Sequence, residues 1–365
     1  EELEREKSVV LQEIKMVEDT PDDVIHDIFA AQIWANHPLG KPILGTRELV
    51  ESFGRDIIAA HFGEEYVPPR IVIAVAGNVT HDRVVELFGR GFNGFTHEPA
   101  RRVSQPARII PGVNIVQKTL EQVHLVIGFP GLHHAAPERY ALFLLNDIVG
   151  GSMSSRLFQE VRERQGLVYS IHSGVQSYAD TGTLYVYAAT DAPNFSKVLK
   201  STLKELREVK KQGVTQDELK RAKDHLKGSL MLSLESTSSR MNRLAKHEMQ
   251  LGSFLTMDAM LAAIDGVRIE ELQAELPLGV VARLDRVPQI SSVEVGIGAV
   301  YLYGFVPHHR LHPQLGLPVK FDERRLTGGV EGDLPDGRRT TVEDRIQQPP
   351  AAELDHAAAR DRMGG

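Results

Sequence analysis

Two glutamates near the start of the chain, Glu6 and Glu13, have a spacing that places them on one side of a helix. Residues 4–18 have a helical pattern, and because each residue turns about 100°, Glu13 returns to within about 20° of Glu6. The same projection places Val10 and Val17 near them, so we expect both carboxylates to lie in the apolar face. A buried carboxylate without a partner costs on the order of several kcal/mol, so this pair needs a cation, a metal ion or a proton. The alternative is a frayed helix end with both carboxylates solvated.

Composition limits the kind of protein that carries this pair. The chain has 365 residues, 42% of them apolar and 25% charged, which is typical of a globular protein with two domains. A net charge of -7 gives no general attraction for nucleic acid or anionic lipid, so we expect neither as a partner. No apolar run approaches the length that spans a bilayer, and we expect a soluble, cytoplasmic protein. The absence of cysteine excludes disulfides and thiolate metal sites.

The first part of the chain is predicted to be mainly helical. Thr20, Pro21 and two aspartates form the start of a second helix, with a capping hydroxyl followed by proline at the first helical position. Residues 37–46 form a loop rich in glycine and proline. Six successive apolar residues from Ile71 predict a buried strand within residues 70–80, followed by a helix from His81.

The second part alternates strand and helix patterns. Residues 94–112 contain prolines and no sustained period, so we place the domain boundary there. Beyond it the sequence predicts two strands, two helices, a hairpin and three long helices, the second of which opens with the capping box Thr215 to Glu218. The two strands are expected at residues 113–118 and 122–130, the two helices at 137–149 and 156–165, and the hairpin at 166–178 with 182–190. The three long helices are expected at residues 194–211, 215–235 and 237–250.

A weak internal repeat suggests that the two parts share one design. Residues 48–62 and 259–276 both have the pattern of a short helix, a turn with small residues and a second helix. The expected fold class is therefore α+β, with two homologous domains, each a sheet covered by helices, and the first incomplete. The domains are expected at residues 1–103 and 113–300, joined by a linker at 104–112. Residues 301–365 are rich in Arg, Asp, Gly and Pro and are expected to form a mostly disordered tail.

One segment resembles a known family. The sequence EKSVVLQEI at residues 6–14, with EDTPDD at 18–23 and NHPLGKPILGT at 36–46, closely resembles the insulinase/pitrilysin-type zinc metallopeptidases, especially their bacterial and mitochondrial processing-peptidase branch. The resemblance spans roughly residues 1–280 and implies metallohydrolase-type domains. It implies that Glu13 is the third zinc ligand, and that Glu6 is the accompanying glutamate that orients the site without binding the metal.

The resemblance also implies roles for Arg162 and Tyr169. They stand seven residues apart in VRERQGLVYS, as in the family's Arg/Tyr pair that faces the metal from the opposite half and hydrogen-bonds the substrate backbone. A guanidinium and a phenol can together hold a peptide carbonyl and share the charge that develops on it. The alternative is a solvated arginine on a helix and a tyrosine that packs on the core from a strand.

The family's catalytic motif is missing from this sequence. Neither H-x-x-E-H nor H-E-x-x-H occurs, and the nearest match, His61 with Glu64, has Glu65 where the second histidine should stand. Two of the three zinc ligands and the general base are therefore absent, and the chain alone should not hydrolyse peptides. Two explanations remain, a chain that begins after the motif or a catalytically silent sister subunit, and the retention of Glu6 and Glu13 favours the first.

The resemblance implies a zinc-dependent endopeptidase that cleaves peptides or unfolded segments in a chamber between two domains. The expected partners are a peptide or unfolded protein substrate and a second subunit, in a homodimer or in a heterodimer with a sister subunit. The rival is a non-catalytic subunit that binds peptides or has a structural role, since fold alone does not decide function. The sequence also lacks G-x-x-x-x-G-K-[ST], which excludes a P-loop NTPase.

Overall fold

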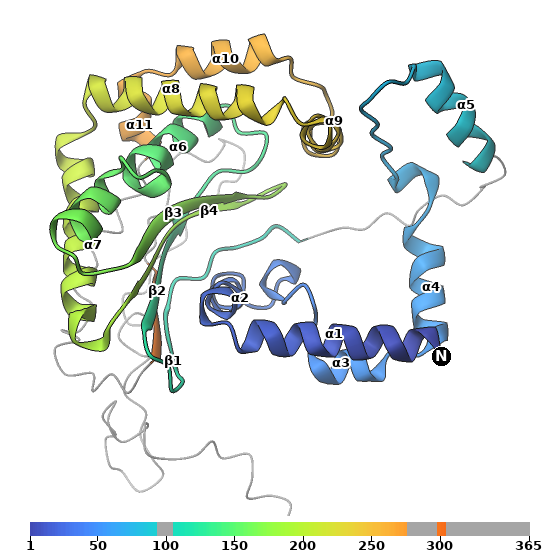
Figure 1. The fold of residues 1–365 in the computed structure, drawn as a ribbon, viewed down its shortest axis with the longest axis horizontal. Coiled ribbons are helices and arrows are strands. Elements are labelled where there is room, and N and C mark those ends of the chain that lie inside the picture. The colour runs from blue at the N-terminus through green and yellow to red at the C-terminus, as the bar shows by residue number, and fades with distance from the viewer. Residues whose placement is uncertain (93–104, 276–297, 304–365) are drawn as a thin grey trace, which may run out of the picture. The chain divides into compact units, whose positions relative to one another are not determined.

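The computed structural model describes residues 1–92, 105–275 and 298–303 (Figure 1). All of them belong to one compact unit, Glu1–Pro307. The remaining unit, His308–Gly365, lies outside the described residues, as does most of the expected tail. The division of the first unit at residues 104–112 stays a prediction.

A five-stranded sheet forms the centre of the unit, in the order β1-β5-β2-β4-β3. All neighbouring strands are antiparallel except β2 and β5, which are parallel. The hairpin of β3 and β4 and the two strands before it confirm the elements predicted from period-2 and β-branched patterns. The strands are β1 Val113–Gln117, β2 Val123–Pro130, β3 Ser170–Ser177, β4 Gly182–Thr190 and β5 Gly298–Tyr303.

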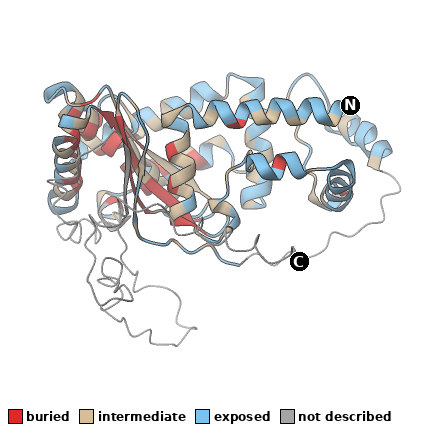
Figure 2. Cartoon of the chain, turned by 90° about the horizontal axis from the view of Figure 1, so that it is seen from below, coloured by how far each residue is buried: buried red, intermediate tan, exposed pale blue. Residues whose placement is uncertain are grey.

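Helices cover one face of the sheet and bury the larger core. Alternate residues of β2, among them Leu125, Ile127 and Phe129, join alternate residues of β4 and the apolar sides of the helices in one cluster. Figure 2 shows this buried material concentrated on the sheet and the helices packed against it. The helical elements of this layer are α6 Arg139–Asn146, η3 Asp147–Gly151, η4 Phe158–Arg164, α7 Phe195–Gln212, α8 Gln216–Ser233, α10 Met257–Gly266 and α11 Ile269–Glu275, and α9 Thr237–Leu251 follows α8 in the chain.

Helix α2 (Pro21–Ile33) lies against the opposite face of the sheet. Its buried residues Ile25, Phe29 and Ile33 cluster with Val126 of β2 and Tyr187 of β4. Because both faces of β2 are covered, this strand is an almost continuous apolar run rather than an alternating one. The proline and the two aspartates predicted to begin the helix occupy its first turn.

The first 92 residues contribute helices and no strand. The predicted strand at residues 70–80 is wrong, because residues 71–76 have no strand pairing and Val72, Ile73 and Val75 are exposed. A strand forms only where a neighbour completes its backbone hydrogen bonds, and no strand of the described residues lies beside this segment. The helical elements here are α1 Glu2–Glu18, η1 Pro38–Gly40, α3 Arg47–Ser52, α4 Arg55–Glu65, η2 Pro68–Arg70 and α5 His81–Phe92.

The expectation that residues 301–303 belong to a disordered tail is wrong. Strand β5 ends at Tyr303 and pairs with both β1 and β2, so residues 301–303 belong to the sheet. The fold class is α+β, as predicted, although the one sheet among the described residues belongs to the second part of the chain. None of the described helices is long and apolar enough to cross a membrane.

Candidate functional site

Arg162 and Tyr169 lie against each other. The central guanidinium carbon of Arg162 is 4.9 Å from the ring centroid of Tyr169 and 4.7 Å from that of Phe158. These distances are those of cation–π contacts, so the guanidinium lies over both rings. Tyr169 is 78% exposed, so its phenol does not pack on the core as the alternative interpretation required. The structure thus brings together the two residues that the sequence paired, while their role stays a prediction.

A tight turn produces this contact. Gly166 has a φ of +60°, a left-handed conformation that glycine adopts without strain. Its N–H donates to the carbonyl of Arg162 at 3.0 Å, and the N–H of Leu167 donates to the carbonyl of Val161 at 3.1 Å. The turn ends η4 and sends the chain back into β3, so that Tyr169 returns to the side of Arg162.

An ion pair fixes the segment that carries Arg162. Arg156 donates from Nε and Nη2 to the two carboxylate oxygens of Glu218 at 2.6 and 2.8 Å, and Nη2 also donates to the carbonyl of Gly213 at 3.0 Å. Glu218 also accepts from the backbone of Thr215, which completes the predicted capping box of α8. Burial raises the pKa of Glu218, but the hydrogen bonds from Arg156 and Thr215 outweigh it and lower the pKa to about 2.

The pairing of Arg156 with Glu218 could not be predicted from the sequence. The two residues are 62 positions apart, and a local pattern carries no information on such a distant partner. The capping box was the only local signal that involved Glu218. It placed Glu218 at the start of α8 and predicted that its carboxylate accepts from the backbone of Thr215, but not that it pairs with an arginine.

Glu6 and Glu13 are both exposed, so the expected burial in the apolar face of α1 is wrong. The buried side of this helix is centred on Ile14, and the half-buried Lys7 on the same side donates to the carbonyl of Phe53 at 3.2 Å. Around the helix axis Glu6 lies about 80° and Glu13 about 100° from Ile14, on the flank of the buried side. The sequence projection placed both glutamates beside Val10 and Val17, but these valines are only partly buried and the buried position is Ile14.

The residues present do not form a zinc site. Within the described ranges, no three His, Asp or Glu side chains come together in an arrangement that could hold a metal ion. Glu13 supplies one carboxylate, whereas a catalytic zinc requires three protein ligands and an open position.

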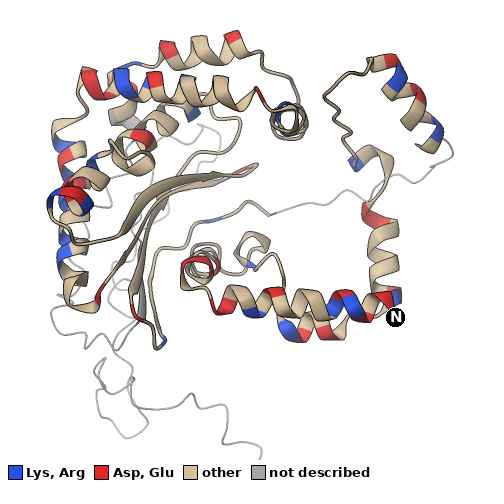
Figure 3. Ribbon diagram, viewed as in Figure 1, with Lys and Arg blue, Asp and Glu red and all other residues tan. Residues whose placement is uncertain are grey.

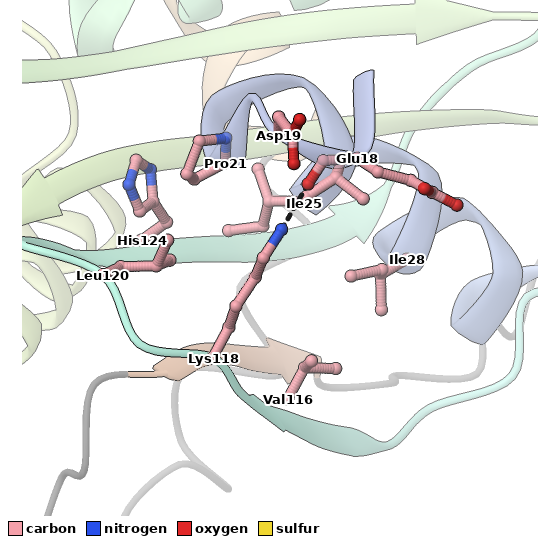
Figure 4. Close-up of a pocket in the computed structure, with 10 residues that line it drawn as sticks. Glu18, Asp19, Pro21, Ile25, Ile28, Val116, Lys118, Leu120 and His124 are labelled. Carbon is pink, nitrogen blue, oxygen red and sulfur yellow. Dashed lines mark hydrogen bonds between the residues drawn. The ribbon is translucent and has the colours of Figure 1, made fainter. Parts of the chain in front are cut away.

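A pocket of about 320 Å³ lies where α1 and α2 meet the first two strands (Figure 4). Lys118, directly after β1, extends across it and donates to the carbonyl of Glu18 at the end of α1. A lysine at this position stabilises the negative end of the helix dipole. The rest of the lining is mostly apolar, with Ile25 and Ile28 from α2 and Val116 from β1. The pocket therefore lies between α1, α2 and the sheet. It could not be predicted from the sequence.

Histidines and tyrosines gather between α2 and the sheet. His26 of α2 packs its ring against Tyr185 and Tyr187 of β4, and His172 of β3 packs against the same two rings. His124 of β2 shares a hydrogen bond of 2.9 Å with the hydroxyl of Tyr187.

The titration behaviour of this cluster follows from its burial. Burial lowers the pKa values of His26, His124 and His172, and for His26 the nearby His172 lowers it further. Burial, with smaller effects from the neighbouring Asp22 and Asp23, raises the pKa of Tyr187 to about 12. The three imidazoles are therefore neutral at pH 7, and α2 is held on the sheet by uncharged aromatic contacts.

Comparisons with known proteins identify the family. Residues 52–226 match the family model described as the peptidase M16 inactive domain. The chain is 40% identical over 271 residues to the Bacillus subtilis protein named "uncharacterized zinc protease YmxG", covering 74% of this chain and 66% of that protein. It is 31% identical over 306 residues to an "uncharacterized zinc protease" of Rickettsia bellii, covering 84% of this chain and 72% of that protein.

Solved structures share the fold at low sequence identity. The crystal structure of a peptidase M16 inactive domain from Pseudomonas fluorescens has a TM-score of 0.68 at 19% identity, covering 84% of this chain and 70% of that one. A chain of complex III2 from Candida albicans has a TM-score of 0.67 at 20% identity, covering 74% and 66%. The chain spans just under two thirds of the length of the Bacillus relative and 65% of a Streptomyces coelicolor relative that is also named a zinc protease. The resemblance stated from residues 6–46 is confirmed, and the chain belongs to the M16 family of zinc protease-like proteins.

Proposed function

We propose that this chain is part of a zinc-dependent endopeptidase of the insulinase and processing-peptidase type, which cleaves peptides or unfolded segments in a chamber between two domains. In this proposal Arg162 and Tyr169 hold the substrate backbone, and the chain alone does not hydrolyse peptides. The observation that carries it is the stack of Arg162 on the exposed ring of Tyr169. The naming of several relatives as zinc proteases supports the reaction class.

The Arg162–Tyr169 pair suits a peptide because its polar groups are available. Among the described residues, no hydrogen bond uses the Arg162 guanidinium, and its one ion pair, with Glu163, is long at 3.7 Å. The guanidinium presents a planar set of N–H donors, and the phenol adds an O–H donor beside them. Together they can donate to one or two main-chain carbonyls and stabilise negative charge on them.

In this proposal the residues of this chain alone do not hydrolyse a peptide bond. Glu13 is proposed as one zinc ligand and Glu6 as the residue that orients it, but the described donor set does not fit a complete site. The remaining ligands and the general base must come from a segment or subunit outside this chain.

Peptide cleavage by the protein expressed from the start codon of its gene tests the proposal. We expect fluorescently labelled, unfolded casein to be cleaved by that protein and not by the 365-residue chain. The variant Arg162→Gln should lower kcat/KM by about tenfold or more, because charged hydrogen bonds to a substrate contribute about 1.5–3 kcal/mol. Arg164→Gln is the matched control, since Arg164 belongs to the same helical element and is exposed. Equal loss in both variants, or no cleavage by the longer protein, would contradict the proposal.

A second candidate function is a non-catalytic partner subunit that binds peptides or supports an assembly. The match of residues 52–226 to the inactive domain of the family favours it. Reading the gene upstream of Glu1 separates the two candidates. A sequence with H-x-x-E-H supports the peptidase, and a sequence without it supports the partner subunit, which should then form a dimer with a sister chain in analytical ultracentrifugation.

A further inference from the structure

We propose that a cluster of cations between α9 and the start of α6 binds a phosphate group, either as inorganic phosphate or as part of a small phosphate monoester. This basic cluster consists of Arg243 and His247 of α9 and Arg139 of α6. None of these residues has a role in the proposed function, so the site stands independently of peptide cleavage.

The end of α9 folds back on the helix and fixes two of these side chains. Gly252 has a φ of +64°, a left-handed conformation that commonly ends helices, and its N–H donates to the carbonyl of Glu248 at 3.1 Å. The turn brings Leu255 back to the helix, where its N–H donates to Nδ1 of His247 at 3.2 Å. The carbonyl of Leu255 accepts from Nη2 of Arg243 at 2.6 Å. One backbone residue thus holds the imidazole and the guanidinium next to each other.

The ring of Phe254 lies beside both groups. Its centroid is 5.2 Å from the central guanidinium carbon of Arg243 and 5.6 Å from the centroid of the His247 ring. Phe254 is 52% exposed, so a ligand that binds the two cationic groups can also contact this ring.

Arg139 adds a second guanidinium from the first turn of α6. Its Nη1 donates to the carbonyl of Ala136 at 3.0 Å, and its central carbon lies 4.6 Å from the ring centroid of Tyr140. Burial, followed by the positive charges of Arg243 and Arg139, lowers the pKa of His247. The phenol of Tyr140 also acts on the charge of Arg243. The start of α6 therefore lies close to Arg243 and His247, and the imidazole is neutral at pH 7.

Within the part of the chain that the structure describes, no carboxylate balances the two arginines. Both donate to backbone carbonyls and form no ion pair there, and Nε of Arg243 is buried without a hydrogen-bond partner. The acidic residues nearest in sequence, Glu138, Glu248 and Asp258, are exposed and pair with neither guanidinium. Figure 3 shows basic residues on α9 and acidic ones on the following helix α10. The basic cluster thus carries positive charge that an anion can compensate.

The charge and the donors of the basic cluster fit a phosphate better than a carboxylate. With the imidazole neutral, two guanidinium charges match the charge of about −1.5 to −2 that a phosphate monoester carries at pH 7. Since Nδ1 of His247 accepts from Leu255, its Nε2 carries the proton and can donate to a ligand. Nη1 of Arg243 and the remaining N–H groups of Arg139 are further donors. A phosphate group can accept from all three side chains, whereas a carboxylate has fewer oxygens and a single charge.

Isothermal titration calorimetry of the complete 365-residue chain with phenyl phosphate, inorganic phosphate and benzoate tests the inference. Both phosphate ligands should bind, and benzoate, which has the same ring but one negative charge, should bind at least about tenfold more weakly than phenyl phosphate. A preference for phenyl phosphate that Phe254→Leu removes would identify a monoester as the ligand. Equal affinity for the two phosphate ligands would identify free phosphate.

Two variants and a control locate the binding. Arg243→Gln and Arg139→Gln should each weaken phenyl phosphate binding at least about tenfold, because charged hydrogen bonds are lost. Arg243 also supports the turn through Leu255, and Arg139→Gln leaves that contact intact. The control is Arg240→Gln on the same helix, where the guanidinium donates to the carbonyl of Leu234. It should bind phenyl phosphate as the wild type does.

The imidazole of His247 gives a second readout. Bound phosphate should raise the pKa of His247, measured by NMR from its Cε1–H signal, and Arg243→Gln should raise it without any ligand.

Four results would overturn the inference: no binding of either phosphate ligand, equal binding of benzoate and phenyl phosphate, equal affinities in Arg139→Gln and Arg240→Gln, or a His247 pKa that phosphate leaves unchanged. Failure of the longer protein to cleave casein would refute the proposed function alone, because phosphate binding requires neither zinc nor the Arg162–Tyr169 pair.

Discussion

The guanidinium of Arg162 rests on the ring of Tyr169, with its central carbon 4.9 Å from the ring centroid. The two residues come from different elements, η4 and the approach to β3, and the left-handed turn at Gly166 joins them. A cation is thus held against the exposed phenol ring of Tyr169.

Removing the hydroxyl of Tyr169 separates its ring from its donor. Tyr169→Phe keeps the cation–π contact, so the unfolding free energy should change by less than about 0.5 kcal/mol. In the protein expressed from the start codon of its gene, kcat/KM for labelled casein should fall by about 3- to 10-fold, because one hydrogen bond to the substrate is lost. Tyr66→Phe, at another exposed tyrosine, is the control. A kcat/KM equal to that of the wild type would show that the hydroxyl does not contact the substrate.

The turn at Gly166 should be sensitive to any side chain. In Gly166→Ala the space is open, but the left-handed backbone costs about 1–2 kcal/mol. The chemical-denaturation midpoint should therefore fall, and kcat/KM for casein should fall with it in the protein expressed from the start codon of its gene, because Tyr169 moves away from Arg162. The control is Gly228→Ala within α8, where the space is also open and the substitution should stabilise the helix by about 0.5–1 kcal/mol. Equal stability changes in both variants would contradict the assigned role of the turn.

The ion pair of Arg156 and Glu218 should make stability depend on pH in the acid range. The pKa of Glu218 is about 2 in the folded chain against an ordinary value of 4.5. Its contribution is therefore fully present above about pH 5 and is lost as the pH falls toward 2, with a maximum of about 3 kcal/mol. Urea unfolding of wild type and Glu218→Gln should show a difference that shrinks between pH 5 and pH 2.

The exposed Glu163 provides the control for that measurement. Glu163→Gln should leave the unfolding free energy within about 0.5 kcal/mol of wild type at every pH. A difference between wild type and Glu218→Gln that stays constant from pH 5 to pH 2 would show that the carboxylate of Glu218 does not carry the pairing.

Acid should loosen α2 from the sheet. His26 and His172 have lowered pKa values because they are buried, so stability that is present above about pH 6.5 is lost as protons bind at lower pH. The carboxylates of Asp22 and Asp23 raise the pKa of His26 and so oppose the effect of burial. Tyr185 and Tyr187 stay neutral over this pH range because their pKa values are raised. Trp34, the only tryptophan, is buried directly after α2 and reports on its position.

The emission of Trp34 should shift to longer wavelength between pH 7 and pH 5. His26→Phe keeps the ring contacts but cannot bind a proton, so the shift should be smaller in this variant. His61→Gln on the exposed helix α4 should behave as the wild type. A shift of the same size in His26→Phe would assign the acid sensitivity to other groups.

Local patterns predicted most of the second half of the chain because its elements carry complete signals. Thr215 and Glu218 predict the start of α8, and two runs rich in β-branched and aromatic residues, separated by residues 179–181, predict the hairpin of β3 and β4. The strand expected from Ile71 did not form, since a strand needs a neighbour that no local pattern specifies. Strand β5 was not predicted, although it forms. Its partners β1 and β2 stand more than 160 residues earlier in the chain, and a local pattern does not show that they complete its hydrogen bonds.

The candidate site shows the same division. Arg162 and Tyr169 could be paired from the sequence because seven residues and one glycine turn connect them. The exposure of Glu6 and Glu13 could not be predicted. Helical periodicity identifies the apolar side of α1, but the elements that pack on the helix determine where the buried side is centred. The contact of Arg156 with Glu218 depends on how the segment just before η4 meets the start of α8 in three dimensions.

The zinc content of the protein expressed from the start codon of its gene tests the central claim most directly. Measured by inductively coupled plasma mass spectrometry after dialysis, it should be about one zinc ion per chain, and Glu13→Gln should lose most of it while the exposed control Glu4→Gln keeps it. Absence of zinc from the longer protein, or equal zinc in Glu13→Gln and Glu4→Gln, would contradict the assignment of this chain to a zinc endopeptidase.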